Sequence, residues 1–408
     1  MNGRVWPPSA RTVKSGSLAG LDYNGRLKPG LPVVYFTVFI DLVGFGIILP
    51  QLPYYAEAFG ATGVWVGALL TAYSAAQFLG ASVLGRLSDR IGRRPVLLAS
   101  LAGSAVSLVL SGLATSLVTL VLARALAGLF GGSIAAAQAY VADSTTPQER
   151  ARYMGFLGAS IGLGFVLGPA LGSGLARYGF GTAAYVAASL AAANLVFGLF
   201  RLPETHGPER RHLAASRPDL SHFLRALRHP SMGRLLGATF FATLAFVAME
   251  ATFALLGEHR FGLEPSRLGF VFTYVGVVIV VVQGGLVGPL AARFGERILA
   301  VAGALLMAVG LGALPLAPSL TVALVGLGLM AAGQGLTSPM LSTLLSRAAD
   351  EDEQGGTLGL GQSLAAAARA VGPLGAGWLY DRSMGAPYAA AAAVMVLAAF
   401  LVGTSRGD

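Results

Sequence analysis

The feature that most constrains this chain is a succession of apolar runs, each about 20 residues long, along most of its length. A helix needs about 20 apolar residues to cross the roughly 30 Å hydrocarbon core of a bilayer. Only 12% of the 408 residues are charged, whereas globular chains carry about 25%. We therefore expect an all-α membrane protein with twelve transmembrane helices. The predicted spans are residues 32–53, 64–84, 95–114, 117–140, 153–176, 182–200, 233–257, 268–287, 298–316, 319–345, 356–379 and 386–403.

The sequence also repeats at half its length. A shift of 204 residues superimposes Gly131 on Gly335, Glu149 on Glu353, Gly155 on Gly359, Gly168 on Gly372 and Pro169 on Pro373. Parallel repeats that enclose a midplane site are a transporter architecture. The predicted division is a disordered cytoplasmic tail (1–30), an N-terminal six-helix half (31–201), a cytoplasmic linker (202–231) and a C-terminal six-helix half (232–404).

The basic residues indicate the orientation. With both termini inside, 22 of the 28 lysines and arginines fall in cytoplasmic segments, four fall outside and two lie within spans. The reverse orientation would violate the positive-inside rule. We therefore expect a multi-pass inner-membrane protein with cytoplasmic termini. Its net charge of +9 then follows from these loops and needs no nucleic-acid partner.

Four motifs, in order along the chain, carry a resemblance to a known family. The loop GRLSDRIGRRP at 85–95 resembles the signature loop of the major facilitator superfamily. DLVGFGIILPQLP at 41–53, ARALAGLFGG at 123–132 and GFVLGPALGS at 164–173 are similar to elements of its twelve-span drug:proton antiporters, tetracycline exporters among them. The resemblance implies the major facilitator fold and the export of lipophilic or cationic drugs by proton antiport through alternating access. We expect a monomer.

Departures from the family pattern bear on the substrate. Ser173 replaces the last glycine of the fifth-span motif. Tetracycline exporters carry an acid at the position of Ser107, and membrane His and Asp residues at those of Ile279 and Met307, so a metal-tetracycline chelate site is not expected. Two other functions stay open. One is a proton-coupled or uniport carrier of a metabolite such as a sugar or amino acid, and the other is a non-transporting receptor or scaffold.

Four ionisable residues lie within predicted spans: Asp41, Arg124, Glu250 and Arg369. Removing a charge from water is costly, so each is a functional candidate. Their charges cancel, and a carboxylate that alternates between a dry site and water can bind and release a proton. We assign all four to proton coupling, with fixed structural pairs as the alternative. Arg369 would either lock Glu250 or neutralise a substrate anion. All five histidines are expected in loops, which leaves proton relay to the carboxylates.

Aromatic and amide side chains near these charges are candidates for substrate binding. Phe45 lies one turn beyond Asp41, and Phe246 and Phe253 flank Glu250 at spacings that share a helix face. Aromatic faces beside a carboxylate suit an amphipathic cation. Ordinary packing and interhelical hydrogen bonds are the alternatives. The candidates are Phe45, Phe246, Phe253, Gln138 and Gln334.

The resemblance also implies roles for two further groups. The signature loop would latch a cytoplasmic gate, with Asp143 a plausible partner for Arg93. This group comprises Gly85, Asp89, Arg90, Gly92, Arg93, Arg94 and Asp143. The fifth-span motif would form a kink tied to antiport, since proline removes a backbone hydrogen bond. Its residues are Gly164, Gly168, Pro169 and Gly172. A generic basic loop and a plain packing kink are the alternatives.

The sequence offers no cofactor, metal or catalytic site. It contains no cysteine, and the loop histidines lack metal-ligand spacing. Its glycine patterns lie inside spans with no preceding strand, so they cannot cradle a nucleotide. No nucleophile with a base can be assembled. We expect a non-enzyme whose partners are a small-molecule substrate, protons and the lipid bilayer.

Overall fold

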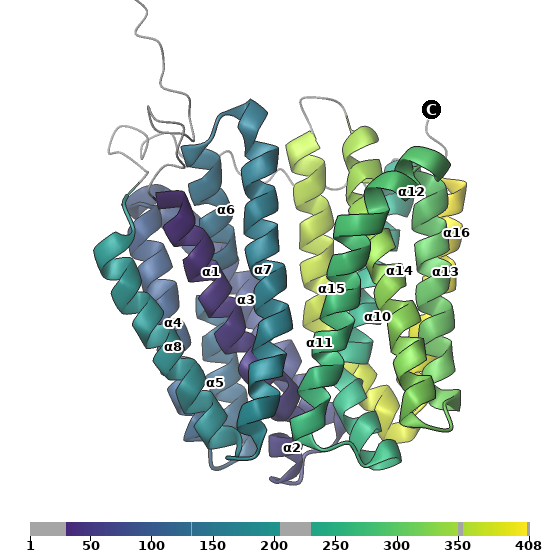
Figure 1. Ribbon diagram of the computed structural model, residues 1–408, viewed down its shortest axis with the longest axis horizontal. Coiled ribbons are helices and arrows are strands. Elements are labelled where there is room, and N and C mark those ends of the chain that lie inside the picture. Colours follow the sequence, from purple (N-terminus) through teal and green to yellow (C-terminus); the bar gives the residue numbers. More distant parts are fainter. Residues whose placement is uncertain (1–29, 132, 205–229, 350–353, 406–408) are drawn as a thin grey trace, which may run out of the picture.

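The computed structural model describes residues 30–131, 133–204, 230–349 and 354–405, and it contains helices and turns but no strand within these ranges. Figure 1 shows two groups of helices side by side. The first group contains α1 (Gly30–Ile48), α2 (Leu52–Glu57), α3 (Gly63–Ile91), α4 (Arg93–Gly112), α5 (Leu117–Phe130), α6 (Ser133–Ser144), α7 (Pro147–Ala176) and α8 (Phe180–Arg201). The second contains α10 (Pro230–Phe261), α11 (Pro265–Val281), α12 (Val287–Phe294), α13 (Glu296–Ala313), α14 (Leu320–Arg347), α15 (Gln354–Arg382) and α16 (Ala386–Thr404).

The all-helical membrane class expected from the apolar runs is confirmed. Within the described residues, 11 helical segments are long and apolar enough to cross a membrane, and each corresponds to a predicted span. The predicted span at 356–379 lies in α15, which is 29 residues long but rich in glycine and alanine and is not among the 11. The predicted tail lies almost wholly in residues 1–29, outside the described ranges, as do residues 205–229 of the predicted linker.

Two predicted spans are interrupted. The helix expected at 117–140 ends as α5 and resumes as α6, with Gly131 at the C-cap of α5. The helix expected at 268–287 contains a π-helical turn at Val282–Leu286, between α11 and α12. Glycine is a poor helix former, and both interruptions contain it, with Gly284 and Gly285 adjacent in the π turn. The apolar pattern predicts that a segment crosses, but it does not reveal such breaks.

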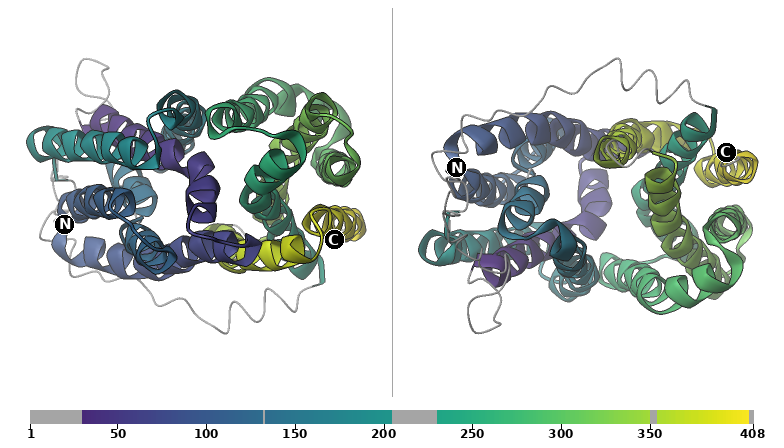
Figure 2. Two further views of the ribbon diagram at one scale, coloured as in Figure 1. Left: turned by 90° about the horizontal axis from the view of Figure 1, so that it is seen from below. Right: turned by 90° about the horizontal axis from the view of Figure 1, so that it is seen from above.

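The two ends of the helix bundle differ in how the groups meet. The chain enters α1 and leaves α16 at the upper end in Figure 1, which we call the terminus face, and α2 lies at the opposite end, the far face. Figure 2 shows α3 beside α15 and α7 beside α11. We call these two contacts the far-side seam, because the close approaches between the groups involve the far-face parts of these helices.

Glycines let the backbones touch along the far-side seam. A Cβ atom on Gly377 of α15 would stand 2.0 Å from the carbonyl oxygen of Gly63 of α3, and one on Gly67 would stand 2.3 Å from that of Pro373. On the other side of the seam, a Cβ atom on Gly269 would stand 2.2 Å from the carbonyl oxygen of Pro169. Any larger side chain at these three positions would therefore push the two groups apart.

Figure 1 shows α7 and α11 diverging toward the terminus face. Glycines of α3, α7 and α15 in this region, at 85, 155, 158 and 359, would each carry a Cβ atom into open space, with nothing within 4 Å. The two groups therefore meet at the far face, and α7 and α11 diverge toward the terminus face (Figure 1).

Candidate functional site

The first membrane carboxylate, Asp41, is held by hydroxyl groups. It lies in α1, and its Oδ2 accepts a hydrogen bond of 2.6 Å from the Ser133 hydroxyl of α6. Ser104 of α4 also bonds its carboxylate. Neutral donors on two neighbouring helices thus fix the carboxylate without neutralising its charge.

Arg124 of α5 is the second member, and it is almost fully buried at 2% exposure. Its Nη2 approaches the Ser111 hydroxyl at 3.4 Å, while its Nε has no hydrogen-bond partner. The guanidinium carbon lies 5.8 Å from the ring centroid of Tyr73 of α3, within cation–π range. An arginine buried with unused donor capacity is costly, so this position is a functional candidate on structural grounds as well.

The remaining two charges belong to the second group. Glu250 of α10 and Arg369 of α15 are both partly buried, and the charge of each acts on the other. No ion pair joins any two of the four membrane charges in the described part of the chain. Glu250 and Arg369 therefore act on each other without direct ion-pair contact.

Tyr73 connects the four charges. Its phenol lies in the electrostatic field of Asp41, Arg124, Arg369 and Glu250. The hydroxyl accepts a hydrogen bond of 3.2 Å from Gln77 Nε2, one turn farther along α3. The sequence analysis missed this residue because a tyrosine in an apolar run resembles any other core aromatic.

The proposed substrate residues occupy different surroundings. Phe45 packs against Tyr73 with ring centroids 5.0 Å apart and the rings tilted by 36°, and it lies 6.1 Å from Phe165 of α7, so it borders the charged centre. Phe246 packs partly buried against the main hydrophobic core. Phe253 is fully buried, at 0% exposure, beside Phe272 of α11. Gln138 is exposed, whereas the Gln334 side-chain oxygen is buried without a partner.

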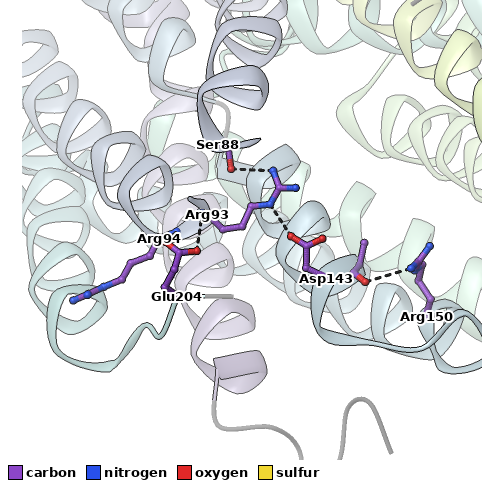
Figure 3. A network of polar contacts seen from close by, with 7 residues as sticks. Ser88, Arg93, Arg94, Asp143, Arg150 and Glu204 are labelled. Carbon is purple, nitrogen blue, oxygen red and sulfur yellow. Dashed lines mark hydrogen bonds and ion pairs between the residues drawn. The ribbon is translucent and has the colours of Figure 1, made fainter. Parts of the chain in front are cut away.

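The signature loop forms a charged network at the terminus face (Figure 3). Arg93, the first residue of α4, pairs with Asp143 of α6 at 2.8 Å, as the sequence suggested, and donates to the Ser88 hydroxyl at 3.1 Å. Glu204 accepts hydrogen bonds from the backbone N–H groups of Arg93 and Arg94, at 2.9 and 3.2 Å. The sequence analysis placed Glu204 in the predicted cytoplasmic linker and gave it no role.

The other signature-loop residues divide into turn formers and exposed groups. Gly92 has a φ of 112°, in the left-handed region that favours glycine, and it makes the turn from α3 into α4. Arg90 is exposed, and a Cβ atom on Gly85 would meet nothing. The side chain of Asp89 lies outside the described part of the structure.

The fifth-span motif lies against α1. Cβ atoms on Gly164 and Gly168 would stand 2.6 Å from Leu42 Cβ and 2.7 Å from Gly46 Cα, and one on Gly172 would stand 2.3 Å from the Ile47 carbonyl oxygen. Pro169 lies inside the continuous helix α7. These residues therefore form the packing contact between α7 and α1, and Pro169 also borders α11 across the far-side seam.

The histidine expectation is wrong in one case. His259 lies in the last turn of α10 and not in a loop, because that helix runs four residues beyond the predicted span. The other four histidines lie outside the described ranges. Among the described residues, no group of three or more histidine, aspartate or glutamate side chains is placed to hold a metal ion.

Comparison with known proteins shows which family the chain resembles along its length. The Major Facilitator Superfamily matches residues 34–287 and 259–406. The tetracycline resistance protein, class C, of Escherichia coli is 34% identical over 84% of this chain and 88% of its own length. Multidrug resistance protein 2 of Bacillus subtilis is 29% identical over 90% of this chain and 92% of its own length.

Solved structures agree with the sequence relatives. The human organic anion transporter MFSD10 (TETRAN) superimposes with a TM-score of 0.69 at 27% identity, over 92% of this chain and 99% of that chain. The resemblance inferred from four short motifs is therefore confirmed over almost the whole length of the chain.

Proposed function

Because the chain belongs to the Major Facilitator Superfamily of membrane transporters, we propose that it exports lipophilic or cationic drugs in exchange for protons. Its relatives are named as tetracycline and multidrug resistance proteins. Ser107 and Met307 are fully buried and provide no carboxylate or imidazole for a chelate. The proposal is therefore drug export in general, with no preference for tetracycline.

The observation that carries the proposal is the position of Tyr73 among four membrane charges. Asp41 belongs to the first helix group and Glu250 to the second, so each group brings one carboxylate to the same centre. Rocking the groups would change the surroundings of both carboxylates together, and a change in water access moves the proton affinity of a carboxylate. Phe45 beside Tyr73 adds an aromatic face suited to a lipophilic cation.

The closed far-side seam supports alternating access. The far face would be the periplasmic side, and the terminus face, with the Arg93 network, would be the cytoplasmic side of an inner-membrane protein. The structure would then be the inward-facing state of a monomer built from two six-helix halves. The Arg93–Asp143 network would act as the cytoplasmic gate, and the glycine contact of α7 with α1 would keep those helices packed while the groups move.

The test is proton release from reconstituted vesicles under an imposed pH gradient, screened with lipophilic cations. A cation should drive proton movement with the unaltered protein, and Asp41→Asn or Glu250→Gln should abolish it without loss of folded protein. Glu264→Gln, which removes an exposed carboxylate at the N-cap of α11, should transport normally. If no cation moves protons and both membrane variants match the unaltered protein, drug antiport is wrong and a metabolite carrier becomes the better reading.

An organic anion is a second candidate substrate. Arg124 has a buried Nε without a hydrogen-bond partner, and Arg369 is only partly buried, so positive charge is present at the centre. The related human structure is that of an organic anion transporter. The same vesicles distinguish the candidates, because an anion substrate would require Arg369 where a cation would require Glu250.

A further inference from the structure

A second cluster of ionisable groups lies at the far face, away from the charged centre. Glu57 ends α2 in the first helix group, whereas Glu258 and His259 lie in the last turn of α10 in the second. His259 Nε2 is 3.3 Å from Glu57 Oε1, and its Nδ1 is 3.0 Å from the hydroxyl of Tyr380 of α15. The cluster therefore joins the two groups where they are closed against each other.

The two glutamates of this cluster face each other. Their carboxyl groups interact directly, and Glu258 Oε2 is buried without a hydrogen-bond partner. An ionised carboxylate can only accept hydrogen bonds, so a bond between two carboxyl groups requires one of them to carry a proton. Two carboxylates that share a site cannot both ionise without strong repulsion.

In the described part of the chain, no arginine or lysine forms an ion pair with either glutamate. From the surrounding elements, Tyr54 and Tyr380 lie in the field of both glutamates, and Asp381 acts on Tyr380; none of the three is basic. Two arginines close to it in sequence have other partners. Arg260 donates to the carbonyl oxygen of Pro315, and Arg382 lies over the ring of Trp378. His259 is thus the basic group placed on the glutamate pair.

We propose that Glu57, Glu258 and His259 form a proton-binding site that exists only while the far side of the molecule is closed. Opening the seam carries Glu57 away with the first group, so both carboxyl groups enter water and release the shared proton. The closed state therefore holds at least one more proton than the open state. By linkage, acid stabilises the state that binds more protons. Low pH favours far-side closure, and rising pH favours opening.

Neighbouring contacts show that the cluster must separate when the seam opens. The Tyr54 hydroxyl of α2 donates to the Leu263 carbonyl oxygen at 2.6 Å, also between the groups. Asp381 binds the start of α3 across the same face. The inference does not depend on the substrate, or on whether protons drive transport, since it concerns the closed and open states alone.

The test uses the natural absence of cysteine. Ala58→Cys and Ser383→Cys place spin labels at exposed far-face positions on the two groups. Double electron–electron resonance then measures the distance between the labels in the absence of substrate. In labelled protein that keeps Glu57 and Glu258, the ratio of open to closed molecules should rise with pH over the range in which the shared proton is lost. One linked proton sets the steepest slope, about tenfold per pH unit.

Variants of the pair complete the experiment. Glu57→Gln with Glu258→Gln should stay closed across pH 5 to 9, because two neutral amides can hydrogen-bond without a proton. Either single variant should reduce the pH response, and this guards against a misfolded double variant. Glu264→Gln, an exposed carboxylate near the same face, should keep the full response. An unaltered background without pH response, or a double variant that titrates like it, would overturn the proposal. In a background that carries Asp41→Asn and Glu250→Gln, where the charged centre binds no proton, the pH response should persist and should still require Glu57 and Glu258, even if drug exchange itself proves absent.

Discussion

Glu296 and Arg347 form an ion pair at 2.8 Å whose charges are reversed relative to those of Arg93 and Asp143. Glu296 stands 203 residues after Arg93, and Arg347 stands 204 residues after Asp143, so both lie within one residue of the 204-residue offset of the sequence repeat. Each pair ties the start of one helix to the end of the next long segment. Gly92 and Gly295 precede them with φ angles of 112° and 80°. The two halves thus share an ionic contact at equivalent positions with the acidic and basic residues exchanged. A search for identical residues between the halves would not detect it.

The two pairs should differ in what they contribute to stability. The Arg93 and Asp143 side chains are 9% and 21% exposed, against 66% and 23% for Arg347 and Glu296. Breaking a buried pair leaves an uncompensated charge and costs about 3 kcal/mol or more, whereas exposed pairs contribute roughly 0–1 kcal/mol. Asp143→Asn should therefore lower the unfolding temperature in detergent well below that of Glu296→Gln, its matched counterpart. Equal effects would contradict the burial argument.

A single added methyl group should prevent far-side closure. In Gly377→Ala the new Cβ would stand 2.0 Å from the carbonyl oxygen of Gly63, a backbone atom that cannot turn away. Overpacking costs about 1–3 kcal/mol, so the closed population should fall by about tenfold or more. Spin labels at Ala58 and Ser383 would report this as a longer distance.

The control for that methyl group lies two residues away in α15. A Cβ on Gly375 would meet nothing within 4 Å, so Gly375→Ala should leave the label distance unchanged. A closed seam in Gly377→Ala would mean that the helices adjust locally without moving the two groups.

The sequence predicted the elements better than the site. Apolar run length determines which segments cross a membrane, so the spans were found, and the motifs led to the family. The charged centre was only partly predicted. Asp41, Arg124, Glu250 and Arg369 are conspicuous in apolar runs, but Ser133 and Tyr73 resemble core residues until the helices are assembled.

The far-side cluster was missed for a physical reason. Glu57, Glu258 and His259 lie at helix ends, where a charged residue normally faces water and needs no explanation. Their significance comes from contact between residues about 200 positions apart, and neither apolar pattern nor internal repeat predicts such a contact. Pairing between the groups depends on how they close, which is a property of one conformational state.

Removing the Tyr73 hydroxyl should impair coupling without harming the fold. Tyr73→Phe keeps the ring that lies near Phe45 and under Arg124, and removes only the hydroxyl that Gln77 bonds. If the hydroxyl couples the protonation of one carboxylate to the other charges, drug-driven proton release should slow by about tenfold. This corresponds to about 1.4 kcal/mol in the activation free energy of transport. The unfolding temperature should change little.

A second tyrosine provides the control for this measurement. Tyr185 of α8 is 41% exposed and lies away from the charges, so Tyr185→Phe should transport at the normal rate. Normal transport by Tyr73→Phe would restrict Tyr73 to a packing role.

Asp381 should stabilise only the closed far side. Its carboxylate accepts hydrogen bonds from the backbone N–H groups of Gly63 and Val64, at 2.6 and 2.9 Å. These donors open α3, and Thr62 at the N-cap provides no side-chain bond to them. The Asp381 carboxylate therefore caps the N-terminus of α3, an interaction that stabilises a helix by about 1 kcal/mol. Unlike an ordinary N-cap, it comes from α15 in the other helix group.

This origin makes the cap specific to one state. Asp381→Ala should lower the closed population about fivefold, the equivalent of about 1 kcal/mol, and Asp381→Asn, which keeps one acceptor oxygen, should fall between. The Ala58 and Ser383 labels measure the change at fixed pH, with Glu264→Gln as the control for removing a far-face carboxylate. If Asp381→Ala lowers the unfolding temperature but leaves the label distance unaltered, the carboxylate caps α3 in every state, and far-side closure depends on the glycine contacts and the Glu57 cluster instead.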